Sequence, residues 1–319
     1  MNTGLYWLFV LAGVLISGGL FLFSARRAGL SVHRAAAGFE LGILLAACSA
    51  WGLCALLGLF SRNGGSPFAY PYRYSFVAGC AGFCLGPVLV CLRERERIPA
   101  LLDRLAAPGC LLIAFMRFGE IWLGQWALAD LRALGLNRIA DGSFLARFPL
   151  SVRDEDLWYP AVSTVAAAAA LIIGIVFFIR SRRETLPGRE GLLFERCAFL
   201  LCAVGFFLEV TRLYCPTFRS VRTDQVLCGL IMLGLAVRAG FRLKKKPARF
   251  PIVSLLLLVL CFALSGLIQY VLENPWQFSS LFDSATFYML QKYLKTVGYP
   301  LLLLTTVLPV LIHGRLTRK

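Results

Sequence analysis

Two pairs of opposite charges interrupt apolar segments of the chain. Arg117 and Glu120 lie in "AFMRFGEIWLGQW", and Glu209 and Arg212 lie in "GFFLEVTRLY". Each pair is spaced i, i+3, so its two side chains share one face of a helix. A guanidinium presents a planar fork of donors that suits a phosphate, and a carboxylate in a low-dielectric pocket can exchange a proton. The two pairs therefore have the residue types for binding a phosphorylated group and moving a proton.

The chain around these charges is strongly apolar. Of its 319 residues, 59% are hydrophobic, and its mean hydropathy is +0.74, which is more apolar than a soluble globular domain. A helix spans the membrane with about 20 apolar residues. Nine segments meet this condition: 5–24, 36–60, 75–92, 105–128, 160–179, 191–213, 223–241, 252–271 and 297–313. The sequence therefore predicts an all-α fold, a polytopic membrane helix bundle of about nine transmembrane helices.

Basic residues mark one end of the predicted bundle. The net charge is +16, and the loops after the first, third, fifth, seventh and ninth segments are densely basic. Short loops rich in Lys and Arg stay on the cytoplasmic side, so we expect the N-terminus outside and the C-terminus in the cytoplasm. Topology and attraction to anionic lipids thus explain the basic charge, and we expect no nucleic-acid partner.

With this topology, both charged pairs lie in the outer half of the membrane. At 1.5 Å per residue, Arg117 is about 18 Å and Glu209 about 27 Å from the inner ends of their helices. Charges there are costly, and two interpretations stay open. Each pair is a salt bridge that only neutralises itself, or both pairs line a polar cavity open to the outer leaflet. Glu195, near the inner end of its segment, is interpreted as interfacial.

Motifs for several other chemistries are absent from the chain. It has no HExxH, GxxxxGK[ST] or GxSxG motif and no GxGxxG that opens a helix. Its eleven cysteines include no CxxC pair and are interpreted as packing residues. Its two histidines, His33 and His313, fall on the predicted cytoplasmic side. We therefore expect no metal, no cofactor and no histidine base at an outer-leaflet site.

Four segments resemble motifs of the bacterial prolipoprotein diacylglyceryl transferase family. "LLDRLAAPGCLLIAFMRFGEIWLGQ" is similar to the signature of the family's fourth span. "YPAVSTVAAAAALI", "GFFLEVTRLY" and "RTDQVLCGLIMLGLAV" resemble motifs of the fifth, sixth and seventh spans. The resemblance covers residues 1–245. The matching positions are Asp103, Pro108, Arg117, Gly119, Pro160, Glu209, Arg212 and Gln225.

This resemblance implies a seven-span core in a bacterial plasma membrane that transfers diacylglyceryl from phosphatidylglycerol to the cysteine of a preprolipoprotein. It also implies roles for particular residues. Glu120, which stands at the signature asparagine, and Glu209 would be catalytic. Substrate-binding residues would be Arg117, Arg212, Gly119, Gln125, Tyr159 and Gln225.

The chain also departs from the family's pattern. Val77 stands where the family has a functional histidine, and Gly205 stands where it has an arginine one turn before Glu209. The last two segments have no counterpart, which divides the chain into a core at 1–245 and an extension at 246–319. A noncatalytic relative that binds phospholipid or lipoprotein is therefore an alternative, and a membrane transporter is a further one.

Overall fold

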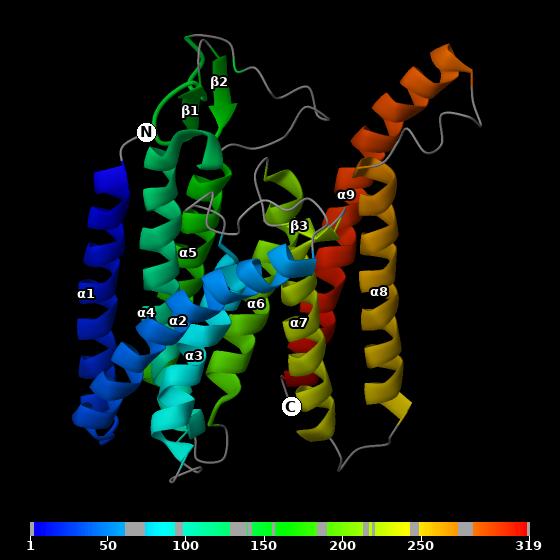
Figure 1. Cartoon of the computed structure of the whole chain (residues 1–319). Coiled ribbons are helices and arrows are strands. Elements are labelled where there is room, and N and C mark those ends of the chain that lie inside the picture. The colour runs from blue at the N-terminus through cyan, green and yellow to red at the C-terminus, as the bar shows by residue number, and fades with distance from the viewer. Residues whose placement is uncertain are drawn as a thin grey trace.

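The chain folds, in a computed structural model, into a bundle of helices with two short hairpins (Figure 1). The structure describes residues 3–60, 74–92, 98–127, 139, 142–154, 157–183, 190–212, 217–218, 221–242, 249–273 and 283–317. These residues form the helices α1 (Thr3–Arg27), α2 (Val32–Phe60), α3 (Phe76–Val90), α4 (Ile98–Gly119), α5 (Val162–Arg183), α6 (Leu192–Thr211), α7 (Thr223–Arg242), α8 (Arg249–Glu273) and α9 (Ser284–Thr317). A 3-10 helix, η2 (Glu120–Ala127), continues α4. The predicted all-α fold class is confirmed.

Seven of the described helices are long and apolar enough to cross a membrane, judged by length and composition: α1, α2, α4, α5, α7, α8 and α9. The other two differ for physical reasons. Helix α3 has 15 residues, and its rise of about 22 Å is shorter than the hydrocarbon core of about 30 Å. Helix α6 carries Glu195, Arg196 and Glu209 within its 20 residues. The chain is thus a multi-pass membrane protein, and the count of nine crossings stays a prediction.

Large apolar side chains cover the outer faces of these helices. Leu15 of α1, Ile172 of α5 and Leu256 of α8 are each more than half exposed. A helix that is apolar on its outer as well as its inner face suits a lipid surrounding. The two ends of the chain lie at opposite ends of the bundle (Figure 1), which an odd number of crossings requires. The side of each end stays a prediction from the basic loops.

Two antiparallel hairpins interrupt the helices. Strand β1 (Ser151–Asp154) pairs with β2 (Leu157–Pro160) at the end of the bundle that carries the N-terminus (Figure 1). Strand β3 (Thr217–Phe218) pairs with β4 (Val221–Arg222) directly before α7. The sequence analysis predicted neither hairpin, because strands of two to four residues are too short to show a period of two.

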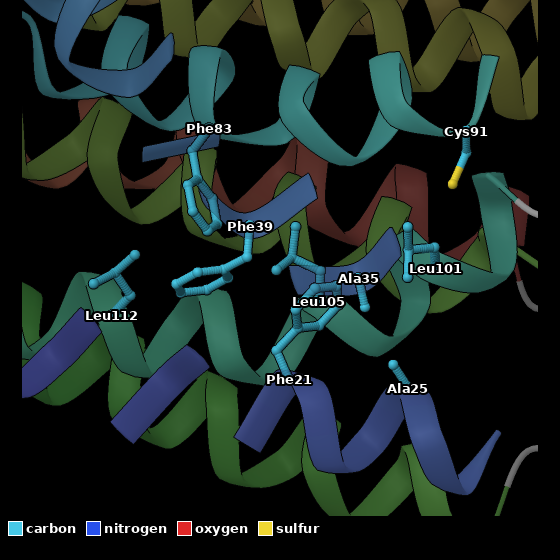
Figure 2. Packing of buried hydrophobic residues seen from close by; sticks show 9 residues of the cluster. All are labelled: Phe21, Ala25, Ala35, Phe39, Phe83, Cys91, Leu101, Leu105 and Leu112. Carbon is cyan, nitrogen blue, oxygen red and sulfur yellow. The ribbon is translucent and has the colours of Figure 1, made fainter. Parts of the chain in front are cut away.

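A cluster of apolar side chains joins the first four helices (Figure 2). Phe39 of α2 stacks on Phe21 of α1 at 5.9 Å between ring centroids, and it meets Phe83 of α3 edge-on at 5.2 Å. Leu105 of α4 is 1% exposed and completes the cluster. Ring pairs in these geometries add to the stabilisation from burial. This packing holds α4, which carries Arg117, against α1, α2 and α3.

Helices α2 and α3 cross with their backbones in contact. A Cβ on Gly86 would lie 2.3 Å from the nitrogen of Gly42 and 2.4 Å from the oxygen of Gly38. A Cβ on Gly82 would lie 2.5 Å from the oxygen of Leu45. The interpretation of Gly82 and Gly86 as a packing face is confirmed, and Gly38 and Gly42 supply the facing glycines that the sequence analysis missed.

The C-terminal helices pack on the rest of the bundle. Met232 of α7 and Leu258 of α8 are fully buried in one apolar cluster with Phe199 of α6. Ile312 of α9 packs against the same cluster. Between α8 and α9, the hydroxyl of Ser265 donates to that of Thr305 at 2.6 Å. The predicted boundary between 1–245 and 246–319 falls on residues outside those described, and the division into two domains stays a prediction.

Replacing Gly86 by alanine tests the backbone contact between α2 and α3. The added methyl overlaps main-chain atoms, which cannot move aside as a side chain can, so we expect a loss of about 1–3 kcal/mol or more in the free energy of unfolding. Gly52→Ala on α2 is the matched control, because nothing lies within 4 Å of that position. Unfolding of the purified protein in detergent measures both variants. Equal effects would contradict the contact.

Candidate functional site

Helices α4 and α6 lie side by side and run in the same direction. Near the N-terminal ends of both helices, the carboxylate of Asp103 accepts hydrogen bonds from the backbone nitrogens of Gly191 at 2.6 Å and Phe194 at 2.8 Å. Asp103, one of the motif positions, therefore caps the first turn of α6. Near the middle of α4 and in the second turn of α6, the sulfurs of Cys110 and Cys197 are 3.2 Å apart. The contacts of Asp103 and Cys110 align α4 with α6, so that the C-terminal ends of the two helices lie together.

At the C-terminal ends of the two helices, Arg117, Glu120, Glu209 and Arg212 form a closed ring of alternating charge, the charge ring. Within each helix, Arg117 Nη1 is 2.9 Å from Glu120 Oε1, and Arg212 Nη1 is 3.0 Å from Glu209 Oε1. Between the helices, Arg117 Nη2 is 3.4 Å from Glu209 Oε1, and Arg212 Nη2 is 3.5 Å from Glu120 Oε2. Each arginine therefore contacts both glutamates.

The charge ring is buried. The exposed fractions of its side chains are 8% for Arg117, 2% for Glu120, 3% for Glu209 and 13% for Arg212. Buried charges are tolerated when they are paired and hydrogen-bonded. The interpretation in which each pair only neutralises itself is therefore incomplete, because the two pairs also neutralise each other.

The segment before α3 forms one wall of the charge ring. The hydroxyl of Tyr74 donates to Glu120 Oε1 at 3.2 Å and lies 3.2 Å from the hydroxyl of Tyr6 on α1. The guanidinium carbon of Arg117 sits 3.7 Å from the centroid of the Phe76 ring, a cation–π contact. The Phe76 ring therefore covers one face of Arg117.

Asp224, at the start of α7, fixes this wall. Its carboxylate is fully buried and accepts hydrogen bonds from the Ser75 hydroxyl and, at 2.9 Å, from the backbone nitrogen of Phe76. The Ser75 hydroxyl in turn accepts from the nitrogen of Ala78 as the N-cap of α3. The negative charge of Asp224 thus sits at the positive N-terminal end of α3.

Arg222 closes the C-terminal end of α6. Its Nη1 donates to the backbone oxygens of Glu209 and Arg212, the latter at 2.7 Å. The last carbonyls of a helix lack partners within the helix, and an arginine there also suits the negative end of the helix dipole. Arg222 thereby holds the turn from which Arg212 reaches the charge ring.

The other predicted substrate-binding residues lie in different surroundings. Gly119 backs onto α1, where a Cβ would come within 3.1 Å of Phe9 and 3.3 Å of Tyr6. Tyr159 lies in β2 opposite Val152. Gln225 is 5% exposed beside Asp224 on α7, and its amide nitrogen has no hydrogen-bond partner among the described residues. The side chain of Gln125 lies outside the described residues.

Both positions that depart from the family's pattern have apolar surroundings. Val77 is buried with Phe206 and Cys228 in one small cluster. A Cβ on Gly205 would lie 3.2 Å from the sulfur of Cys228. Within the described parts of the chain, no three His, Cys, Asp or Glu side chains are grouped so as to hold a metal ion.

A second charged cluster lies at the N-terminal end of α6. Glu195 is 1% exposed, and its carboxylate oxygens lie 3.0 Å from Arg242 Nη1, 3.7 Å from Arg238 Nε and 3.6 Å from His313 Nε2. The His313 ring stacks on Phe199 at 4.0 Å between centroids. Glu195, interpreted as interfacial, is thus enclosed by α7 and α9, and its depth in the membrane stays a prediction.

Comparisons with known proteins found no relative of this chain. No protein-family model, no curated protein and no solved structure matches the chain. Function is therefore inferred from the geometry of the charge ring and from the motif positions in the sequence.

A pair of substitutions tests whether the charge ring acts as one unit. Arg117→Met or Glu120→Gln alone leaves an unbalanced buried charge, and we expect each to lower the free energy of unfolding by about 3–5 kcal/mol. The double variant restores the balance and should lose clearly less than the sum of the two. Unfolding in detergent of all four proteins measures the coupling. Additive losses would contradict a shared ring.

Proposed function

We propose that this membrane protein binds the phosphate of a phospholipid headgroup at the charge ring and transfers a diacylglyceryl group from phosphatidylglycerol to an acceptor such as a lipoprotein cysteine. The acceptor side would be the outer face of the membrane. The proposal agrees with the resemblance of the segments that carry Arg117, Glu209 and Arg212 to the transferase motifs.

The convergence of two guanidinium groups carries this proposal. Arg117 and Arg212 come from different helices and contact the same two carboxylates at 2.9–3.5 Å. A phosphate has the charge and the acceptor oxygens to take the place of a carboxylate between them. Two fixed arginines also suit a reaction in which negative charge grows on a leaving phosphate, because they are already oriented when that charge develops.

The proposed reaction uses one carboxylate as a base. Glu120 or Glu209 accepts the proton of the acceptor thiol. The sulfur then attacks the carbon of the diacylglyceryl unit that bears the phosphate. The carbon–sulfur bond forms as the carbon–oxygen bond to the phosphate breaks. Glycerol phosphate leaves with the electron pair of that bond, and its charge is held by Arg117 and Arg212.

A noncatalytic phospholipid-binding protein is the second candidate. It is favoured by the packing at two positions where the family has functional side chains. Val77 lies in an apolar cluster and Gly205 faces the sulfur of Cys228. Position 77 on α3 therefore supplies no histidine, and position 205 on α6 supplies no arginine. Binding through the two remaining arginines would not need either group.

Complementation tests the transferase. In bacteria depleted of their own diacylglyceryl transferase, we expect the chain to restore lipidated lipoprotein, detected by mass spectrometry. Arg117→Ala removes a donor to the leaving phosphate and should lower the rate by about 100-fold or more. Arg212→Lys keeps the charge but loses the planar fork and should also be impaired.

The control is Arg26→Ala, since Arg26 is exposed at the end of α1, and this variant should restore lipidation as the wild type does. Membrane levels of each variant are compared by immunoblot. If the wild type fails but phosphatidylglycerol copurifies with it and is lost in Arg117→Ala, the noncatalytic candidate replaces the transferase. Failure of both lipidation and lipid binding would reject both.

A further inference from the structure

The charges at and around the charge ring sum to zero. The ring itself has two arginines and two glutamates. Among the described residues, the charged groups Arg222 and Asp224 also lie near the ring, and both interact electrostatically with Glu209. Among the described residues the positive charges are therefore Arg117, Arg212 and Arg222, and the negative charges are Glu120, Glu209 and Asp224.

A phosphodiester headgroup such as that of phosphatidylglycerol brings one further negative charge. If the phosphodiester displaced a glutamate from the arginines, the buried site would carry a net charge of −1. The displaced carboxylate would then have too few hydrogen-bond donors. An uncompensated charge in such a site is strongly disfavoured, and a buried carboxylate in this position takes up a proton instead. A zwitterionic headgroup brings its own positive charge, so its binding requires no proton uptake.

Glu209 is the carboxylate with room for that proton. Its Oε1 contacts both arginines, but its Oε2 is buried and has no hydrogen-bond partner among the described residues. Glu120 differs, because Arg117 and Tyr74 donate to its Oε1 and Arg117 and Arg212 donate to its Oε2.

The charged and titratable groups that interact with Glu209 among the described residues come from several elements. Arg117 lies on α4, Glu120 on η2 and Arg212 at the end of α6. Arg222 comes from the end of β4, and α7 contributes Asp224 and the thiol of Cys228. The Tyr74 hydroxyl approaches through Glu120. Among the described residues, these neighbours leave the oxygen Oε2 of Glu209 without a hydrogen-bond partner.

We infer that an anionic phosphodiester headgroup binds to the charge ring together with one proton, which is held by Glu209. This inference rests on the proposed function, and it assigns the proton-accepting role to one of the two glutamates. In the transferase, the acceptor thiol can supply that proton, so that headgroup binding and formation of the thiolate depend on each other. Without an acceptor, the proton comes from water.

Isothermal titration of the full chain in an uncharged detergent tests the inference. Dioctanoyl phosphatidylglycerol is titrated at one pH in two buffers that differ in ionisation enthalpy, and the difference in heat gives the number of protons exchanged. We expect an uptake of about one proton per headgroup, and an affinity that falls by up to about tenfold per unit of rising pH. The affinity falls as the pH rises because the bound state holds one proton more than the free state. Binding is therefore strongest at low pH.

Glu209→Gln should bind the same lipid with no proton uptake and with an affinity that does not change with pH, since one negative charge is already gone. Glu40→Gln is the matched control, because Glu40 is exposed on α2, and it should keep the wild-type coupling. If Glu209→Gln does not fold, Glu120→Gln provides the test, since it also removes one negative charge and should also bind without proton uptake.

Two further titrations identify the ligand. Dioctanoyl phosphatidylcholine should bind, if at all, with no proton uptake, and inorganic phosphate should bind at least about tenfold more weakly than the lipid, because it lacks the acyl chains. Equal binding of inorganic phosphate would overturn the lipid headgroup as the source of the phosphate.

The outcomes separate the inference from the function on which it rests. Arg117-dependent binding of phosphatidylglycerol without proton uptake, with Glu209→Gln indistinguishable from wild type, would overturn the inference and leave phospholipid binding intact. No binding of phosphatidylglycerol at any pH that depends on Arg117 would overturn the binding function as well.

Discussion

The pairing of Arg117 with Glu209 across α4 and α6 is the constraint on which the C-terminal ends of these two helices depend. A buried charge that loses its partner costs more than most apolar contacts supply, so neither helix can slide past the other. Asp103, Cys110 and Arg117 stand at seven-residue intervals on α4 and meet α6 at its first turn, its second turn and its last turn. The apolar clusters then fill the space that this fixed register leaves.

The helices could be predicted from the sequence because the signal for them is local. Twenty apolar residues between basic loops indicate a membrane helix whatever its neighbours are, and all nine predicted segments are helical. The charged pairs could be found for the same reason, since a charge in an apolar segment is conspicuous. The similar depth of the two pairs could be predicted by counting residues along α4 and α6. The contacts between the pairs could not, because they depend on how each helix is rotated about its axis.

The residues that the sequence analysis missed act through tertiary contacts. Arg222 and Asp224 lie outside apolar segments or at their edges, where charges are ordinary, and Tyr74 precedes α3 without any motif. Glu195 looked interfacial because it lies near a helix end, yet α7 and α9 bury it. Periodicity reports which residues share a helix face, but it does not report which neighbour covers that face.

The position of α9 affects how the chain can be divided. His313 lies against Phe199 and beside Glu195, while Ile312 packs on the cluster that contains Met232. A shortened chain that ended after α7 would place this surface of α6 and α7 in contact with lipid. Glu195 would then keep its two arginines but lose its cover from α9. The two last helices therefore serve as part of the scaffold, and a minimal version of this protein would need a redesigned α6–α7 face.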